Sequence, residues 1–242
     1  HFQFVHHPIW DHDMSSAPLL GDVTIDGKPR KIVAVPSKQS YLYVFDRITG
    51  QPIWPIPETP VPMSTVPGEK TSPTQPIPSK PPSYARAFVK LPDDAMDFTP
   101  ELKKQALDQF NWFVNNPTPY NPPIVSSLEG KIAAMTIGTL TGGSNWPGAT
   151  YDPELHTVFA PACNSCIAPL GLVKPPKEVS DIDYIMGTAG ATARLITGGG
   201  EGDGVAAAAG REGQRAAVEG GVDALQAHAV VLAARQQVGR QD

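Results

Sequence analysis

Short apolar runs separated by turn residues fill the first part of the chain. Four of these runs are typical of β-strands, because apolar, β-branched and aromatic side chains dominate them. They cover residues 19–25, 31–35, 41–45 and 51–54. Asp26-Gly27, between the first two runs, is a strong hairpin signal. Four short antiparallel strands within about 40 residues indicate one blade of a β-propeller.

Proline interrupts this pattern between residues 55 and 82. Because proline lacks a backbone donor and fixes φ, the stretch is neither a helix nor a central strand. A disordered linker is one interpretation. We favour an ordered loop over the scaffold, because the stretch contains apolar side chains that can anchor it. These are Ile56, Val61, Met63 and Ile77.

One helix is predicted, beginning at Thr99. Thr99 fits the N-cap, Pro100 fits the first helical position, and Glu101 places an acid in the first turn. One face carries an apolar stripe at helical spacing, which we interpret as a packing surface. The stripe consists of Leu102, Ala106, Phe110 and Phe113.

Strand-like runs return after this helix, at residues 128–137, 149–152 and 157–160. The last two runs would open a further blade. A glycine-rich turn at residues 142–148 does not lead from a strand into a helix, so it is not a dinucleotide-binding loop.

The composition is typical of an all-β protein with many turns, and the net charge argues against one class of binding partner. The 27 prolines in 242 residues are about twice the usual proportion. A net charge of −5 and a pI near 5.7 argue against a nucleic-acid surface. No apolar run approaches the roughly 20 residues of a membrane span. The chain begins at His1 without an initiator Met and already inside a motif, so we interpret it as an internal fragment.

The composition changes abruptly at Gly187. Every proline, lysine and aromatic residue precedes this point, and the last 56 residues contain 14 Ala and 12 Gly. One interpretation is a low-complexity tail with a helix at about residues 222–238. We favour the other, a lost coding frame. The predicted organisation is therefore a propeller part at residues 1–186 and a Gly/Ala-rich tail at residues 187–242.

The two cysteines, Cys163 and Cys166, have C-x-x-C spacing. A structural zinc site needs a second pair of ligands, and a thioredoxin-like site needs a βαβ context. The pair is therefore either two small apolar residues in a loop or, in an oxidising compartment, a local disulfide.

Residues 6–13 concentrate the chemistry-bearing side chains: three histidines, one tryptophan, Asp11 and Asp13. Lys38 follows Asp11 by 27 residues, at the end of a strand-like run. On the residues alone, Asp11 is typical of a turn aspartate and Lys38 of a solvated charge. Asp13 is interpreted as a loop-stabilising acceptor. The histidines could suggest a metal site, but structural or substrate-cleft roles are favoured.

In the order of several motifs, the chain resembles the pyrroloquinoline quinone (PQQ)-dependent dehydrogenases, in particular the membrane-associated glucose and quinate type. The resemblance covers residues 1–186. Its motifs are Phe2-Gln3-Phe4-Val5-His6-His7, Trp10-Asp11-His12-Asp13, Pro36-Ser37-Lys38-Gln39, the run from Val44 to Trp54, Thr71-Ser72-Pro73-Thr74-Gln75-Pro76, Asp97-Phe98-Thr99-Pro100-Glu101-Leu102 and Asn145-Trp146-Pro147-Gly148-Ala149.

The resemblance implies a partial β-propeller, with two to three blades of an eight-bladed ring that holds PQQ on its axis. It implies that Asp11 is the general base and that Lys38 contacts the cofactor, with Asn164 as a further cofactor contact. The metal ligands of the family lie upstream of His1, so no metal ligand is assigned here. The intact enzyme would hold Ca²⁺ or Mg²⁺.

The function implied is oxidation of the CH–OH group of a sugar, polyol or other alcohol. A carboxylate would take the hydroxyl proton while hydride passes to the cofactor, and a lysine would polarise the accepting carbonyl. The resemblance further implies ubiquinone as electron acceptor and a periplasmic, membrane-associated location. The fragment itself is expected to be inactive. The alternative is a non-enzymatic β-propeller that serves as a binding or scaffold module.

Overall fold

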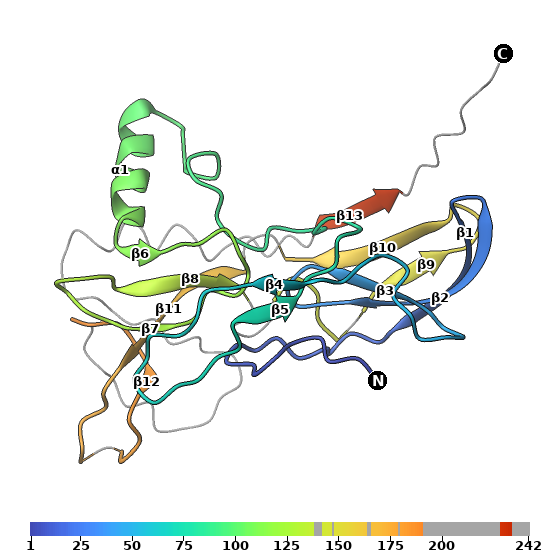
Figure 1. Ribbon diagram of the computed structural model, residues 1–242. Helices are drawn as coiled ribbons and strands as arrows, with labels where there is room; N and C mark the ends of the chain where they lie inside the picture. The colour runs from blue at the N-terminus through green and yellow to red at the C-terminus, as the bar shows by residue number, and fades with distance from the viewer. Residues whose placement is uncertain (138–141, 147, 164–165, 179, 191–227, 234–242) are drawn as a thin grey trace.

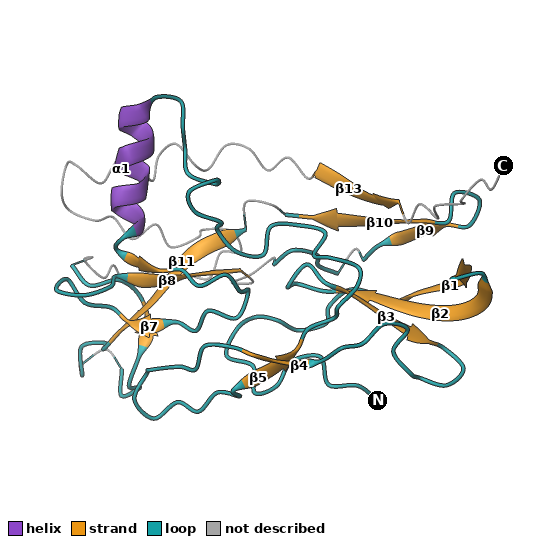
Figure 2. Ribbon diagram, turned by 45° about the horizontal axis from the view of Figure 1, so that its top comes forward, coloured by secondary structure: helices purple, strands orange, loops and turns teal. Residues whose placement is uncertain are grey.

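The computed structural model describes residues 1–137, 142–146, 148–163, 166–178, 180–190 and 228–233. Loops and turns connect short strands in open sheets, and one helix projects from one end (Figures 1 and 2). The expected all-β class is thus confirmed. In chain order the elements are β1 (Leu19–Ile25), β2 (Lys28–Pro36), β3 (Leu42–Asp46), β4 (Glu58–Pro60), β5 (Thr74–Pro76), α1 (Pro100–Phe110), β6 (Phe113–Val114), β7 (Ile124–Val125), β8 (Ala133–Ile137), β9 (Thr150–Asp152), β10 (Thr157–Ala162), β11 (Ile167–Val173), β12 (Ile185–Met186) and β13 (His228–Ala233).

The first sheet has the antiparallel order β1-β2-β3. Asp26 and Gly27 connect β1 to β2 with φ of 50° and 71°, the left-handed conformation that a tight hairpin needs at both positions. The expected fourth strand at residues 51–54 is wrong as a strand. Asp46 N donates to Gln51 O at 2.8 Å and Ile53 N donates to Val44 O at 2.9 Å, but the pairing stops at one isolated bridge between Phe45 and Pro52.

The proline-rich stretch is an ordered loop, as favoured from the sequence. It contains the short antiparallel hairpin β4-β5. Val61 is buried and Ile77 packs beside it, so both serve as anchors, whereas Met63 is 54% exposed and does not.

The remaining strands form two further sheets. One has the order β12-β11-β8-β6, with β7 on β11, and the other has the order β13-β10-β9. The helix at about residues 222–238, part of the interpretation of the tail that was not favoured, is wrong for its described part, because His228–Ala233 pairs with β10 as strand β13. Adjacent β-branched residues favour a strand where a neighbouring edge offers backbone partners. The rest of that prediction lies outside the described residues.

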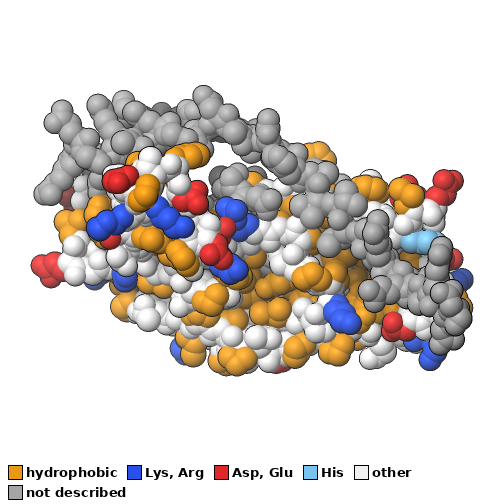
Figure 3. Space-filling model, turned by 90° about the horizontal axis from the view of Figure 1, so that it is seen from above, with side chains coloured by type: hydrophobic (Ala, Val, Ile, Leu, Met, Phe, Trp, Pro, Cys, Tyr) orange, Lys and Arg blue, Asp and Glu red, His pale blue; other side chains and the backbone are white. Residues whose placement is uncertain are grey.

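Helix α1 begins as predicted. The Thr99 side chain accepts a hydrogen bond from Leu102 N at 3.2 Å, and Pro100 occupies the first turn. Its apolar stripe is only half-buried, and no residue of the helix is fully buried. Charged side chains gather over α1, at the left of the face in Figure 3. No helix in the described part of the chain is long and apolar enough to cross a membrane.

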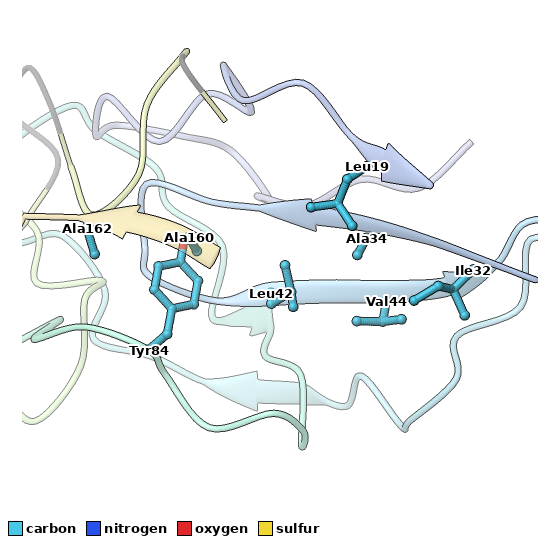
Figure 4. Close-up of a cluster of buried hydrophobic side chains, with 8 residues drawn as sticks. All are labelled: Leu19, Ile32, Ala34, Leu42, Val44, Tyr84, Ala160 and Ala162. Carbon is cyan, nitrogen blue, oxygen red and sulfur yellow. The ribbon is translucent and has the colours of Figure 1, made fainter. Parts of the chain in front are cut away.

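Two buried clusters hold the segments that matter for function. The larger one joins the first sheet to β10, with Tyr84 inserted between them (Figure 4). Its buried members are Leu19, Ile32, Ala34, Leu42, Val44, Tyr84, Ala160 and Ala162. The smaller cluster is built from Val5, Trp10, Val61 and Tyr120, so it fixes the N-terminal segment beneath the proline-rich loop.

Candidate functional site

Lys38 lies in the turn that follows β2, and its side chain is only 5% exposed. Ser40 N donates to Ser37 O at 3.0 Å to close this turn, and Ser40 has a φ of 67°. A lysine is seldom buried unless its charge is paired. The turn therefore implies carboxylates at the ammonium group.

Asp11 and Asp13 supply those carboxylates. Lys38 Nζ lies 3.0 Å from Asp11 Oδ2 and 2.5 Å from Asp13 Oδ1. The structure thus brings together Asp11 and Lys38, which the motif spacing had linked. It also gives Asp13 a partner that the sequence interpretation had missed. The side chains of Asp11 and Asp13 are 43% and 57% exposed, so solutes can reach both carboxylates.

Burial alternates along the segment that carries the two aspartates. Trp10 and His12 are buried, whereas Asp11 and Asp13 face outward. Trp10 Nε1 donates to Asn121 O at 2.7 Å, and its ring stacks on the His12 ring at a centroid distance of 5.4 Å. His12 Nε2 lies 2.9 Å from Ile137 O. These contacts hold the segment in one register, which keeps the two carboxylates on the same side.

Electrostatics in this cluster follows from its geometry. Burial alone would lower the pKa of Lys38, but the hydrogen bonds and charges of Asp13 and Asp11 outweigh burial and raise it. The hydrogen bond from Lys38 lowers the pKa of Asp13. Burial lowers the pKa of His12 to about 4, so this imidazole is neutral at ordinary pH. Lys38 is therefore a fixed cation at neutral pH.

The Lys38 turn is tied to two distant segments. Gly143 N donates to Lys38 O at 2.6 Å, and Cys163 N donates to Gly143 O at 2.8 Å. Gly142 has a φ of +61°, and a Cβ built on it would lie 2.5 Å from Lys38 Cβ. The glycine-rich turn is thus a backbone support for Lys38, and close approach to another chain segment is a recognised reason for such glycines.

Tyr84 is a second support that the sequence analysis missed. Its hydroxyl accepts from Ser37 N at 3.2 Å and lies within donating distance of Ser37 O (3.0 Å) and Ser144 Oγ (2.8 Å). Ser144 Oγ in turn donates to Pro161 O at 2.5 Å. An isolated tyrosine among prolines gives no local pattern that would reveal these long-range partners.

The other predicted site residues have different outcomes. Cys163 and Cys166 form a disulfide, which confirms one of the two interpretations of the pair. Asn164 lies outside the described residues. His6 Nε2 is 2.8 Å from Glu58 Oε1. No group of three or more His, Cys, Asp or Glu side chains in the described ranges could hold a metal ion.

Some buried polar atoms near Lys38 have no hydrogen-bond partner. They are both amide atoms of Gln39, Ser40 Oγ and His12 Nδ1. Buried polar groups are normally satisfied, so these atoms are exceptions in the described part of the chain. Two hollows of the described surface lie elsewhere, one at the β9–β10 turn and one at the β1–β2 hairpin.

Comparison with known proteins gives a family match over most of the chain. The β-propeller domain of glucose/ethanol/alcohol dehydrogenases (PQQ) matches residues 1–194. Quinoprotein glucose dehydrogenase of Gluconobacter oxydans is 34% identical over 66% of this chain and 19% of its own length. Quinoprotein glucose dehydrogenase of Escherichia coli is 39% identical over 31% of this chain and 10% of its own length.

Quinate/shikimate dehydrogenase (quinone) of Acinetobacter baylyi is 28% identical over 65% of this chain and 19% of its own length. The chain therefore spans at most about a fifth of the length of these relatives. Its open sheets agree with one part of a propeller.

Proposed function

Because the chain belongs to the PQQ β-propeller family of glucose, ethanol and alcohol dehydrogenases, we propose that it is part of an enzyme that oxidises the CH–OH group of a sugar, polyol or other alcohol. The observation that carries this proposal is the buried Lys38 ammonium, held beside the half-exposed Asp11 carboxylate at 3.0 Å. In this proposal Asp11 is the general base, Lys38 contacts the cofactor, and Asn164 is a further cofactor contact.

The residues around Lys38 fit PQQ, which carries quinone oxygens and carboxylates. A lysine ammonium has three N–H donors. Asp13 accepts one of them at 2.5 Å and Asp11 forms an ion pair with the ammonium at 3.0 Å, and no other described carboxylate pairs with it. The unpartnered amide of the buried Gln39 adds a donor and an acceptor in the same turn. The site therefore offers a cation and hydrogen-bonding groups of the kinds that such an anion needs.

Each protein group has a defined task in the proposed reaction. PQQ, when bound, supplies the electrophilic carbonyl that accepts hydride from the substrate carbon. Asp11 takes the hydroxyl proton on a carboxylate oxygen, and its exposure lets a substrate reach it. The Lys38 ammonium stabilises negative charge that develops on the accepting oxygen, and its burial strengthens that interaction. The supports around Ser37 and Gly143 keep the ammonium in place.

Several finer parts of the proposal concern the intact enzyme. We propose Ca²⁺ or Mg²⁺ as its metal, ubiquinone as the electron acceptor, and a periplasmic, membrane-associated location. The quinone named for the Acinetobacter relative supports the acceptor. The Cys163–Cys166 disulfide supports the location, because disulfides persist in oxidising compartments such as the periplasm.

We also propose that residues 1–186 are the propeller part and residues 187–242 a Gly/Ala-rich tail that arose by a shift of the coding frame. The abrupt loss of proline, lysine and aromatic residues supports this boundary. Sequencing the surrounding DNA tests it. An alternative frame that continues a propeller sequence after residue 186 is expected, and its absence would remove the frame-shift proposal.

Reconstitution of the intact enzyme tests the function. The apo-enzyme is incubated with PQQ and Ca²⁺ or Mg²⁺, and reduction of an artificial electron acceptor is followed with glucose, quinate, glycerol and ethanol. PQQ-dependent reduction with at least one substrate is expected. No reduction with any of them, from a protein that binds PQQ, would contradict the proposal. The 242-residue chain alone is expected to reduce no acceptor.

A further inference from the structure

Asp13 makes the shorter of the two contacts with Lys38, yet the reaction proposed above assigns it no task. Its Oδ1 lies 2.5 Å from Lys38 Nζ, compared with 3.0 Å for Asp11 Oδ2. The pKa of Asp13 is lowered by this hydrogen bond before any other cause. Asp13 is therefore a principal counter-ion of the buried ammonium.

The position of Asp13 results from the alternating burial of its segment. His12 is 1% exposed and is fixed between Trp10 and Tyr120, with ring centroids 5.4 and 5.6 Å away. The residues on either side of His12 consequently project to the outer side together. Lys38 lies between them, so one ammonium group is divided between two carboxylates.

The sharing of the Lys38 ammonium between Asp11 and Asp13 determines how well Asp11 can act as a base. If Asp11 were the sole counter-ion, the ammonium could direct two N–H groups at Asp11, which would stabilise its ionised form and weaken it as a base. With Asp13 present, Lys38 Nζ donates a hydrogen bond to Asp13 Oδ1 at 2.5 Å and forms an ion pair with Asp11 Oδ2 at 3.0 Å, so fewer N–H groups are directed at Asp11 and one is left for the cofactor. We propose that Asp13 is a positioning residue, which draws the Lys38 ammonium away from Asp11 and keeps Asp11 able to act as a base. This inference rests on the proposed function.

The test compares three variants of the intact enzyme. Asp13→Asn removes the charge while keeping the size, and Asp13→Glu restores the charge. Asp22→Asn is the matched control, because Asp22 is 67% exposed and pairs with Arg47 at 2.7 Å, away from Lys38. The measurements are kcat, KM and the dissociation constant of PQQ from the apo-enzyme, which is read by fluorescence titration without any turnover.

Asp13→Asn is expected to lower kcat at least about tenfold, the scale of a weakened general base. The PQQ dissociation constant should not rise, because Lys38 still faces the cofactor and one negative charge has gone. Asp13→Glu should recover most of kcat, and Asp22→Asn should match the wild type. A wild-type kcat in Asp13→Asn overturns the inference. So does a PQQ dissociation constant that rises in proportion to the loss of kcat, since that result means the site has lost its structure.

A second measurement on the 242-residue chain separates this inference from the proposed function. Acylation of the Lys38 amine by a lysine-directed reagent is followed by mass spectrometry. Asp13→Asn should raise the rate by about tenfold for each unit by which the pKa of Lys38 falls, whereas Asp22→Asn should not change it. An unchanged rate in Asp13→Asn would show that Asp13 does not hold the ammonium. If the rate rises but the intact wild-type enzyme shows no PQQ-dependent turnover, the proposed function fails and the catalytic role of Asp13 fails with it.

Discussion

Replacement of Tyr84 by phenylalanine tests how the Lys38 turn is held. The ring of Tyr84 is 3% exposed and stays in the core in this variant, so apolar burial hardly changes. Only the hydroxyl is lost. Burial raises the pKa of Tyr84 to about 12, so at neutral pH the hydroxyl is protonated and acts as both donor and acceptor.

The expected cost follows from the groups left behind. Ser37 N loses the acceptor that it has at 3.2 Å, and Ser37 is 1% exposed, so water does not replace it. A buried donor without a partner costs about 1–3 kcal/mol. With a urea m-value of about 2 kcal/mol/M, a loss of about 2 kcal/mol lowers the unfolding midpoint by about 1 M.

Urea unfolding of the chain, followed by tryptophan fluorescence, measures this cost. Tyr151→Phe is the matched control, because the Tyr151 hydroxyl makes only exposed contacts, at 3.3 Å to Asp22 O and to His156 Nδ1. The control should lie within about 0.5 kcal/mol of the wild type. Equal midpoints for Tyr84→Phe and Tyr151→Phe would refute the reasoning that Tyr84 supports the turn.

Two further predictions concern His12 and Gly142. Because burial lowers the pKa of His12 to about 4 from 6.5, the unfolded chain binds a proton between these values that the folded chain does not. Stability should therefore be complete above pH 6.5 and fall by up to about 3 kcal/mol as the pH drops to 4. Urea midpoints across this range should show the slope in the wild type, and a folded His12→Phe variant with the same slope would contradict it. Gly142→Ala should destabilise the chain by about 1–3 kcal/mol more than Gly27→Ala in the same assay. Both glycines have positive φ, but only at Gly142 would the added Cβ meet Lys38, whereas nothing lies within 4 Å at Gly27; equal losses would mean that the close approach to Lys38 has no energetic weight.

The sequence predicted the parts of the fold that depend on local pattern. The hairpin at Asp26 and Gly27 needs left-handed backbone at both positions, and Asp-Gly is a residue pair that adopts this conformation readily. The Thr99 cap of α1 is equally local. One of the two interpretations of the tail placed a helix at His228–Ala233, and it was wrong there because these residues pair with β10, a partner far away in the chain.

The residues of the candidate site were also predictable where a sequence motif contains them and not where a distant contact places them. The motif order linked Asp11 to Lys38, and the structure places their charged atoms 3.0 Å apart. The role of Asp13 toward Lys38 could not be read from the sequence, because it depends on His12 turning inward. Tyr84 and Gly142 were missed because their partners lie far away in the chain, and because a single tyrosine or glycine occurs in many different structural settings.

The central claim is that Asp11 is the base of a PQQ-dependent alcohol oxidation with Lys38 beside the cofactor. Asp11→Asn in the intact enzyme tests it most directly, because asparagine keeps the size of the side chain but cannot take the proton. The predicted result is a fall in kcat of about 10²- to 10⁴-fold, with a PQQ dissociation constant equal to that of the wild type. A variant that binds PQQ and turns over at the wild-type rate would contradict the claim.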